Sequence, residues 1–198
     1  MIISAIEKLK KAQYNVYIDG EYAFSCNSED LSYLGIEEGK EIDNEQYNYY
    51  VNYIAIRRAK DYAFKLLSKK IVTEKELYKK LKIRGFSENV INEVIEKLKS
   101  YNYINDEIYA KLFIEQKMNQ LHSRKKIYYE LINKGINREV IQESLRNFYP
   151  KEKEVEIIKK IIEKKLKFQE DTKKLKNYLY NSGFEIENIS TAFREKDL

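Results

Sequence analysis

The stretch TEKELYKKLKIRGFSENVINEVIEKLKSYNYI, Thr73 to Ile104, contains a pattern that occurs three times in the chain. Its anchor is Gly85; matching glycines follow at Gly135, 50 residues later, and at Gly183, a further 48 residues on. A leucine stands four residues before each glycine and another apolar residue four before that, the spacing of one helix face. We expect each glycine to close a helix, because glycine adopts the left-handed terminal conformation without strain.

The same helices also have marked beginnings. Twelve residues before the glycines stand Thr73, Ser123 and Asp171, all residue types that cap helix N-termini. An isoleucine recurs six residues after each glycine, within a second apolar stripe. Agreement at the caps, stripes and glycines predicts tandem helical units of about 50 residues.

Each unit gains a third helix from the apolar pattern upstream of its capping residue. We therefore predict a mainly α fold of three tandem three-helix repeats, covering residues 54–104, 105–150 and 151–198. A unit of this size buries too few apolar side chains to be stable alone, so neighbouring repeats must share a core. The expected arrangement is an elongated, curved array.

Residues 1–53 have a different pattern and predict a small β-rich module. Asp19 and Gly20 form a favourable two-residue hairpin turn between alternating segments, and residues 2–9 are compatible with a further strand. A short helix is expected to begin at Ser28 and end at Gly35, and residues 39–43, GKEID, resemble another short strand.

Charge separates the two parts of the chain. Residues 1–56 contain four Lys/Arg and ten Asp/Glu, a net charge of −6, whereas residues 57–198 contain 33 and 22, a net charge of +11. A basic helical array favours a polyanionic or acidic partner. No apolar run is long enough to span a membrane and Cys26 is the only cysteine, so we expect a cytoplasmic protein without disulfides.

Catalytic residues are scarce. His122 is the only histidine, which excludes zinc sites that need two, and its position in a loop predicts an exposed side chain. Cys26 is expected to be a half-buried strand residue, and GIEEGK, Gly35 to Lys40, lacks the spacing of a phosphate-binding loop. We therefore predict that the protein is not an enzyme and uses no metal or cofactor.

Basic residues are the stronger candidates for function, and they gather around the middle helix of each unit. One interpretation is a solvated, solubilising surface; the other is a contact surface for a polyanion or an acidic protein groove. A helix-turn-helix interpretation is weaker, because the helix after Gly85 begins with acidic and apolar residues. The candidate contact residues are Arg57, Arg58, Lys69, Lys70, Lys75, Lys79, Lys82, Arg124, Lys125, Lys126, Lys173, Lys174 and Lys176.

At Thr73 to Phe113 and Ser123 to Ile136 the sequence resembles the RecX family, bacterial regulators of the RecA recombinase. Agreement with the family pattern includes Leu81, Gly85 and Phe86, the Asp106/Glu107 pair, Tyr109 with Ala110, and Leu131 with Gly135. The amino-terminal module, with YIDGEYAF, is similar to the extension of Gram-positive members. The chain departs from the family pattern at Asn119 to Ser123, where many members have a glycine-containing loop.

The resemblance implies a non-enzymatic modulator, most often an inhibitor, that binds as a monomer in the helical groove of RecA filaments on single-stranded DNA. Lower ATP hydrolysis and strand exchange in recombination and repair would result. The family motif transfers no contact residues, so the basic residues remain our own prediction. The alternative is a stand-alone helical-repeat protein that binds DNA through its basic face.

Overall fold

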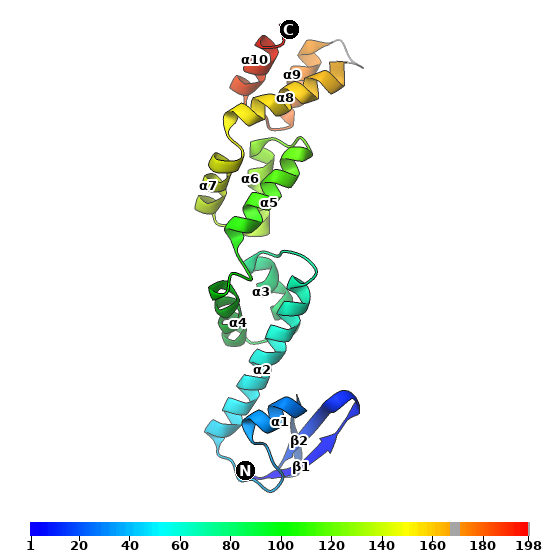
Figure 1. Ribbon diagram of the computed structural model, residues 1–198, viewed down its shortest axis with the longest axis vertical. Helices are drawn as coiled ribbons and strands as arrows, with labels where there is room; N and C mark the ends of the chain where they lie inside the picture. Colours follow the sequence, from blue (N-terminus) through cyan, green and yellow to red (C-terminus); the bar gives the residue numbers. More distant parts are fainter. Residues whose placement is uncertain (167–170, 198) are drawn as a thin grey trace. The chain divides into compact units, whose positions relative to one another are not determined.

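The computed structural model describes residues 1–166 and 171–197, and in these residues it contains ten α-helices and one three-stranded sheet (Figure 1). The chain divides into two compact units. The first contains residues 1–69 and 80–97, and the second contains residues 70–79 and 98–198. The helix α3, Glu74–Ile83, contributes its first part to the second unit and its last part to the first. The predicted fold class, helical repeats after a small β-rich module, is confirmed.

An antiparallel sheet opens the first unit. It contains β1 (Ile3–Lys8), β2 (Gln13–Ile18) and β3 (Glu21–Asn27) in that order, with the 3-10 turn Lys10–Ala12 between the first two strands. The predicted hairpin turn is confirmed: Asp19 and Gly20 have φ of 49° and 86°, the positive values that a two-residue turn between twisted strands requires. The apolar residues of one sheet face join the unit's core.

Two helices follow the sheet in the first unit, α1 (Ser28–Leu34) and α2 (Asn44–Leu67). Both begin with a capping box, at Asn27 and Asp43, in which the side chain and backbone of residues three apart bond reciprocally. The prediction of a strand at residues 39–43 is wrong. This segment forms a single bridge, between Ile2 and Glu41, because Gly39 turns with φ 82° and Asp43 already caps α2.

The last half of α2, α3 and α4 (Glu88–Ser100) are the three helices of the first repeat. Each buries the apolar stripe that its sequence predicts, at positions three or four residues apart. Fully or almost fully buried are Ala59 and Ala63 in α2, Leu77 and Leu81 in α3, and Ile91 and Ile95 in α4.

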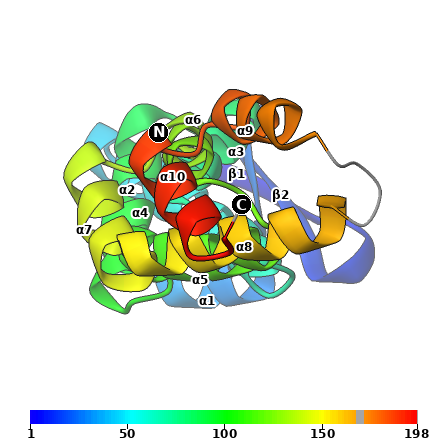
Figure 2. The same ribbon diagram turned by 90° about the horizontal axis from the view of Figure 1, so that it is seen from above.

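Six more helices lie in the second unit. They are α5 (Asp106–Asn119), α6 (Arg124–Lys134), α7 (Arg138–Phe148), α8 (Lys151–Leu166), α9 (Thr172–Asn181) and α10 (Ile186–Arg194). Their buried residues form one continuous cluster from Ala110 to Phe193, so the second and third repeats share a core as predicted. In Figures 1 and 2, α10 packs along α8.

A buried hydroxyl joins each repeat to the next one within this unit. The capping residues Thr73 and Ser123 are both 0% exposed. Thr73 Oγ1 donates to the carbonyl of Lys134 at 2.9 Å, and Ser123 Oγ donates to the carbonyl of Ser182 at 2.7 Å. Because Lys134 and Ser182 immediately precede Gly135 and Gly183, the two bonds occupy equivalent positions. Each hydroxyl caps its own helix and satisfies the end of the corresponding helix in the next repeat.

A second bond accompanies each hydroxyl. The backbone N–H of Glu74 donates to Asp106 Oδ1 at 3.1 Å, and that of Arg124 donates to Glu154 Oε1 at 2.8 Å. Both donors belong to the first turn of a middle helix, and both carboxylates belong to the first helix of the next repeat. The positive end of the helix dipole favours a carboxylate there. Each hydroxyl bond and the N–H bond beside it form a pair, and we call such a pair a repeat joint.

The close packing at the repeat joint also requires glycine at position 135. Gly135 has φ 90°, and a Cβ added there would lie 2.6 Å from the Cβ of Lys75, far inside van der Waals contact. At Gly85, with φ 85°, an added Cβ would meet nothing within 4 Å. The positive φ values confirm the predicted helix-closing role of both glycines, and Gly135 additionally lets the preceding repeat approach.

We expect Gly135→Ala to destabilise the protein more than Gly85→Ala. Both variants place alanine in the left-handed conformation, at a cost of about 1–2 kcal/mol. Gly135→Ala must also displace the Lys75 backbone, which adds about 1–3 kcal/mol. Urea unfolding followed by circular dichroism measures both, and equal losses would contradict the close approach.

The Glu154 carboxyl makes the joint between the second and third repeats sensitive to pH. Burial raises the pKa of Glu154, although hydrogen bonds from the Arg124 N–H and the Asn188 amide partly oppose the increase. The folded protein therefore binds the proton more tightly than the unfolded chain does. The stabilising contribution of this carboxyl is fully present below the unfolded pKa of about 4.3 and is lost as pH rises through the folded pKa.

We expect Glu154→Gln, which cannot titrate, to show a weaker dependence of stability on pH. The unfolding free energy of the wild type minus that of the variant should decrease from about pH 4 upward. Urea unfolding of both proteins over a pH series tests this, and a difference that stays constant with pH would disprove it.

Candidate partner-binding site

Cys26 is buried in the structure, which disfavours it as a nucleophile. The thiol of Cys26 is 2% exposed rather than half-buried as predicted, because its strand lies in the core, and burial raises its pKa to about 11. A thiol with so high a pKa is a poor nucleophile. Among the described residues, no group of three or more side chains is placed to hold a metal ion.

The prediction that His122 is exposed is wrong, because the chain turns inward at this loop. Its side chain is 20% exposed, and its carbonyl accepts a hydrogen bond of 2.9 Å from the buried Tyr149 hydroxyl. Leu121 adopts φ 60° immediately before it, which permits the sharp turn into the core. Sequence pattern cannot show this, because the partner residue is 27 positions away.

The arginines of α2 have a structural partner. Arg57 Nε and Nη2 donate to the two carboxylate oxygens of Asp30 at 2.5 and 2.8 Å, and Asp30 is 1% exposed. A buried carboxylate that receives a bidentate arginine is a strong internal pair. Arg58 is exposed and donates one hydrogen bond, to the Ser25 carbonyl at 3.1 Å.

Several predicted contact lysines lie beside carboxylates at the surface. Lys70 pairs with Glu76 at 2.5 Å, and Lys82 pairs with Glu88 at 2.9 Å. Lys174 lies 3.5 Å from Asp171, whose carboxylate caps α9. Exposed pairs of this kind contribute about 0–1 kcal/mol and exchange easily for another anion. Their lysines therefore remain available to a partner, unlike Arg57.

One lysine position recurs in every repeat. Lys75, Lys125 and Lys173 each follow the helix-capping residue by two positions, and all three are exposed. All three belong to the second unit. The repeat joint fixes the start of α3 and of α6 against the next repeat, so Lys75 and Lys125 lie at a set place in the structure. Lys173 has the same position relative to the cap of α9.

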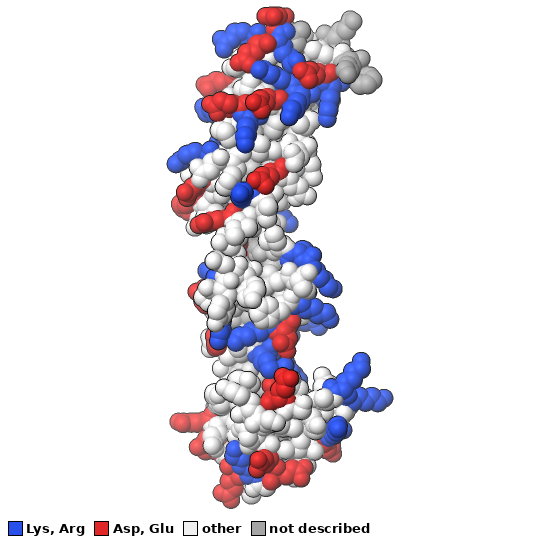
Figure 3. All heavy atoms as spheres, in the orientation of Figure 1, with Lys and Arg blue, Asp and Glu red and all other residues white. Residues whose placement is uncertain are grey.

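The other predicted residues have varied surroundings. Lys69, Lys79, Lys126 and Lys173 are exposed, whereas Arg124 is half-buried and donates to the Tyr149 carbonyl. Lys176 Nζ lies 4.7 Å above the Phe193 ring. Figure 3 shows blue and red side chains interspersed over α8, so charge alone does not mark a binding face there.

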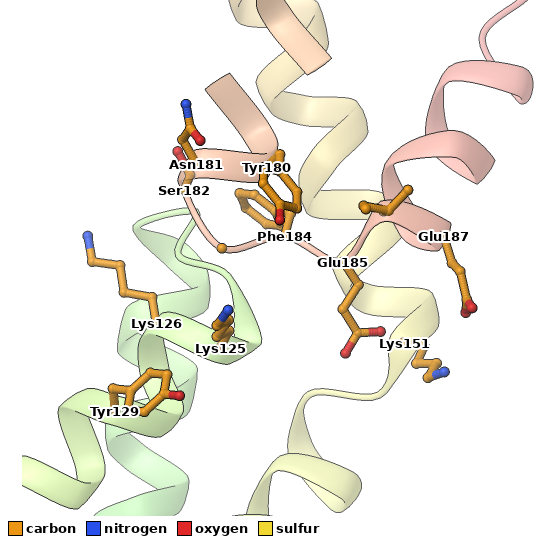
Figure 4. A pocket seen from close by; sticks show the side chains of 12 residues that line it. Lys125, Lys126, Tyr129, Lys151, Tyr180, Asn181, Ser182, Phe184, Glu185 and Glu187 are labelled. Atoms are coloured by element: carbon orange, nitrogen blue, oxygen red, sulfur yellow. The ribbon is translucent and has the colours of Figure 1, made fainter. Parts of the chain in front are cut away.

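The structure also brings together residues that the sequence prediction missed. A cleft of about 990 Å³ lies between the start of α6 and the turn from α9 into α10 (Figure 4). Tyr129 and Tyr180 line it and are 55% and 58% exposed. Helical spacing predicts that Tyr129 lies beside Lys125, because it follows by one turn. It does not predict that residues of α9 lie beside them, because these come close only when the two repeats pack together. The predicted residues Lys125 and Lys126 are joined there by Tyr129, Lys151, Tyr180 and Asn181.

Three family models match the chain in order. The Regulatory protein RecX N-terminal domain matches residues 1–43, the first RecX three-helix domain matches residues 59–98, and the second matches residues 105–145. A Regulatory protein RecX from Caldanaerobacter subterraneus is 55% identical over 192 residues, covering 97% of this chain and 98% of the relative. The chain belongs to the RecX family. The RecX of Clostridium acetobutylicum is 34% identical and covers 96% of this chain and 92% of its own.

Solved RecX structures share the fold. A crystal structure of regulatory protein RecX covers 100% of this chain and 99% of its own at 27% identity, with a TM-score of 0.74. RecX from Lactobacillus salivarius covers 72% of this chain and 97% of its own at 29% identity, with a TM-score of 0.68. None of the described helices combines the length and apolar character needed to cross a bilayer.

We expect Arg57→Ala and Arg58→Ala to differ in stability although both remove one positive charge. Arg57→Ala leaves the buried Asp30 carboxylate unpaired, which costs about 3–5 kcal/mol, while Arg58→Ala removes one exposed hydrogen bond at a cost of about 1 kcal/mol or less. Urea unfolding distinguishes them. If Arg57→Ala were as stable as Arg58→Ala, its pair with Asp30 would not be structural.

Proposed function

We propose that this RecX-family protein modulates the RecA recombinase, as an inhibitor and without catalysis of its own. In this proposal it binds as a monomer, in the cytoplasm, in the helical groove of RecA filaments on single-stranded DNA. ATP hydrolysis and strand exchange decrease as a result. Membership of a family of regulatory proteins supports this function, and the main structural support is the exposed lysine that recurs in the three repeats.

The mechanism that we propose is wedging. The filament groove is lined by repeated subunits, and a binder that contacts several of them opposes their movement relative to one another. Lys75, Lys125 and Lys173 recur at equivalent positions of repeats that share buried hydrogen bonds. Such a set of cations suits a repeated acidic surface or the phosphates near it. Resistance to subunit motion would uncouple ATP turnover from strand exchange.

Binding to naked DNA is the alternative function, and the basic excess of residues 57–198 favours it equally. The two functions differ in salt dependence. Affinity for naked DNA decreases steeply as salt increases, with a log–log slope of about −0.7 for each single-strand phosphate neutralised. A protein that recognises the filament groove requires RecA for tight binding.

The first experiment measures binding to naked single-stranded DNA and to the RecA filament on the same DNA, with ATP, at near-physiological salt. ATP hydrolysis is recorded in parallel. Preference for the filament together with falling hydrolysis supports the regulator. Equal binding to naked DNA, with hydrolysis unchanged until the DNA is saturated, supports the alternative.

We expect the triple variant Lys75→Glu, Lys125→Glu and Lys173→Glu to inhibit ATP hydrolysis by the filament at least tenfold less effectively. Loss of three exposed ion pairs of about 0.5 kcal/mol each accounts for this factor, and the new repulsion adds to it. The matched control is Lys8→Glu, Lys10→Glu and Lys11→Glu, an equal change of charge at exposed lysines of the amino-terminal module. Equal loss of inhibition in both variants would mean that net charge, not the recurring position, is responsible.

A further inference from the structure

A second, smaller cavity lies beside the repeat joint that Ser123 makes with the third repeat. It has a volume of about 320 Å³. Its walls come from the turn before α6, the start of α6, the end of α8, and α9, all within the second unit. We call it the His122 pocket; the residues that matter here are His122, Lys126, Lys164, Lys165, Tyr178 and Ser182.

Two cations of the His122 pocket, Lys126 and Lys165, lie against rings rather than carboxylates. Lys126 Nζ lies 3.3 Å from His122 Nε2, and Lys165 Nζ lies 4.0 Å from the centre of the Tyr178 ring. Within residues 1–166 and 171–197, no carboxylate pairs with Lys126, Lys164 or Lys165. This distinguishes them from lysines such as Lys70 and Lys82, which have a carboxylate beside them. Three lysines that no carboxylate of the described residues pairs with favour an anionic ligand.

The surroundings of His122 favour its neutral imidazole. Burial lowers its pKa, and Lys126 of α6 and Lys117 of α5 lower it further, while Glu130 of α6 opposes them. His122 Nδ1 lies 3.5 Å from Glu130 Oε1, makes no hydrogen bond to any described residue, and is buried. Glu130 is itself paired with Lys117 at 2.9 Å. An anion that entered the pocket would stabilise the protonated imidazole.

The larger cleft of Figure 4 continues from this pocket and shares Lys126, Ser182 and Phe184 with it. Beyond Lys126 it exposes the rings of Tyr129 and Tyr180. Glu185 and Glu187 occupy the other end of this cleft, where they would repel a phosphate. Lysines and exposed aromatic rings thus line the same cleft near Lys126. This combination suits single-stranded nucleic acid, whose unpaired bases stack on aromatic rings while its phosphates meet lysines.

We propose that the His122 pocket binds a backbone phosphate of single-stranded DNA through Lys126, Lys164 and Lys165, with a neighbouring base stacked on Tyr129 or Tyr180. The inference rests on the proposed function and refines it by assigning this junction to the DNA rather than to RecA. Duplex DNA fits less well, because its bases are already stacked and cannot lie on the tyrosines.

The test uses the full chain and an oligo-dT strand, without RecA. His122 is the only histidine, so a single imidazole C2–H resonance reports the pocket by proton NMR. The pKa of His122 should rise when oligo-dT is added. Inorganic phosphate is expected to raise it only at far higher concentration, and a polyglutamate peptide of equal charge is expected to have little effect. A polyglutamate response equal to that of oligo-dT would overturn the proposal in favour of an acidic protein.

Variants test the two parts of the site by fluorescence anisotropy with oligo-dT. Lys164→Gln with Lys165→Gln should reduce the magnitude of the log–log salt slope by about 1.4, because two phosphate contacts at about 0.7 each are removed. Tyr129→Leu with Tyr180→Leu should weaken binding about tenfold and leave the slope unchanged, because stacking releases no counterions. Lys10→Gln with Lys11→Gln, which makes the same charge change at exposed positions, is the control. Wild-type affinity and slope in the Lys164/Lys165 variant would overturn the proposal.

The same variants distinguish this proposal from the proposed function. If the Lys164/Lys165 variant loses oligo-dT binding and RecA hydrolysis is nevertheless unaffected by the wild-type protein, the pocket is supported and regulation of RecA is not. If the variant binds oligo-dT normally and the wild-type protein inhibits RecA, the regulator stands and the pocket is rejected.

Discussion

The hydroxyl of the helix-capping residue is the interaction on which the helical repeats depend. A cap normally satisfies the first N–H groups of its own helix. Thr73 and Ser123 do this and, in addition, donate the hydroxyl proton to a carbonyl at the end of the next repeat's middle helix. A hydroxyl can accept and donate at once, and a carboxylate cannot donate. One buried hydroxyl therefore bonds both to the start of its own helix and to the end of a helix in the next repeat.

This sharing explains several features that seem independent along the sequence. The backbone after Lys134 and Ser182 lies close to the start of the preceding repeat's middle helix, so the next residue is glycine at both places. A carboxylate must receive the adjacent N–H, so Asp106 and Glu154 stand in the first turn of the following helices. A burial cost accompanies both carboxylates, and it raises the pKa of each. Position within the repeat, rather than local propensity alone, selects these residues.

Much of the fold could be predicted because its signals are local. Capping residues, a left-handed glycine and an apolar stripe act within one or two helical turns, and all recur at Thr73, Ser123 and the matching positions. The bidentate pair of Arg57 with Asp30 joins residues 27 apart, so pattern alone could not separate it from the exposed Arg58. The expected exposure of His122 is wrong for the same reason: the tyrosine that holds its loop lies far along the chain. The wrong strand at residues 39–43 has another cause. A pattern of alternating apolar and polar residues does not show where a glycine ends the pairing between strands.

Less of the candidate site than of the fold could be predicted from the sequence. Lys125 and Lys126 could be selected by their recurrence, but Lys164 and Lys165 lie in a helix with lysines throughout, where no pattern marks two of them. Which cations have a carboxylate beside them depends on side chains that meet only after folding. The same applies to Tyr129 and Tyr180, which look like ordinary surface residues until the turn at Gly183 brings them to one cleft.

Asp171 occupies the capping position of the third repeat but lacks the hydroxyl donor. It caps α9 as Thr73 and Ser123 cap their helices, but it is exposed and its carboxylate has no proton to donate. A serine at this place would be able to donate its hydroxyl to the carbonyl before a glycine turn of another molecule. A head-to-tail contact of that kind forms a filament wherever its rotation does not close a ring. A carboxylate instead repels the carbonyl oxygen of such a turn. Asp171 thus disfavours, at this exposed surface, the hydroxyl bond that Thr73 and Ser123 make between repeats.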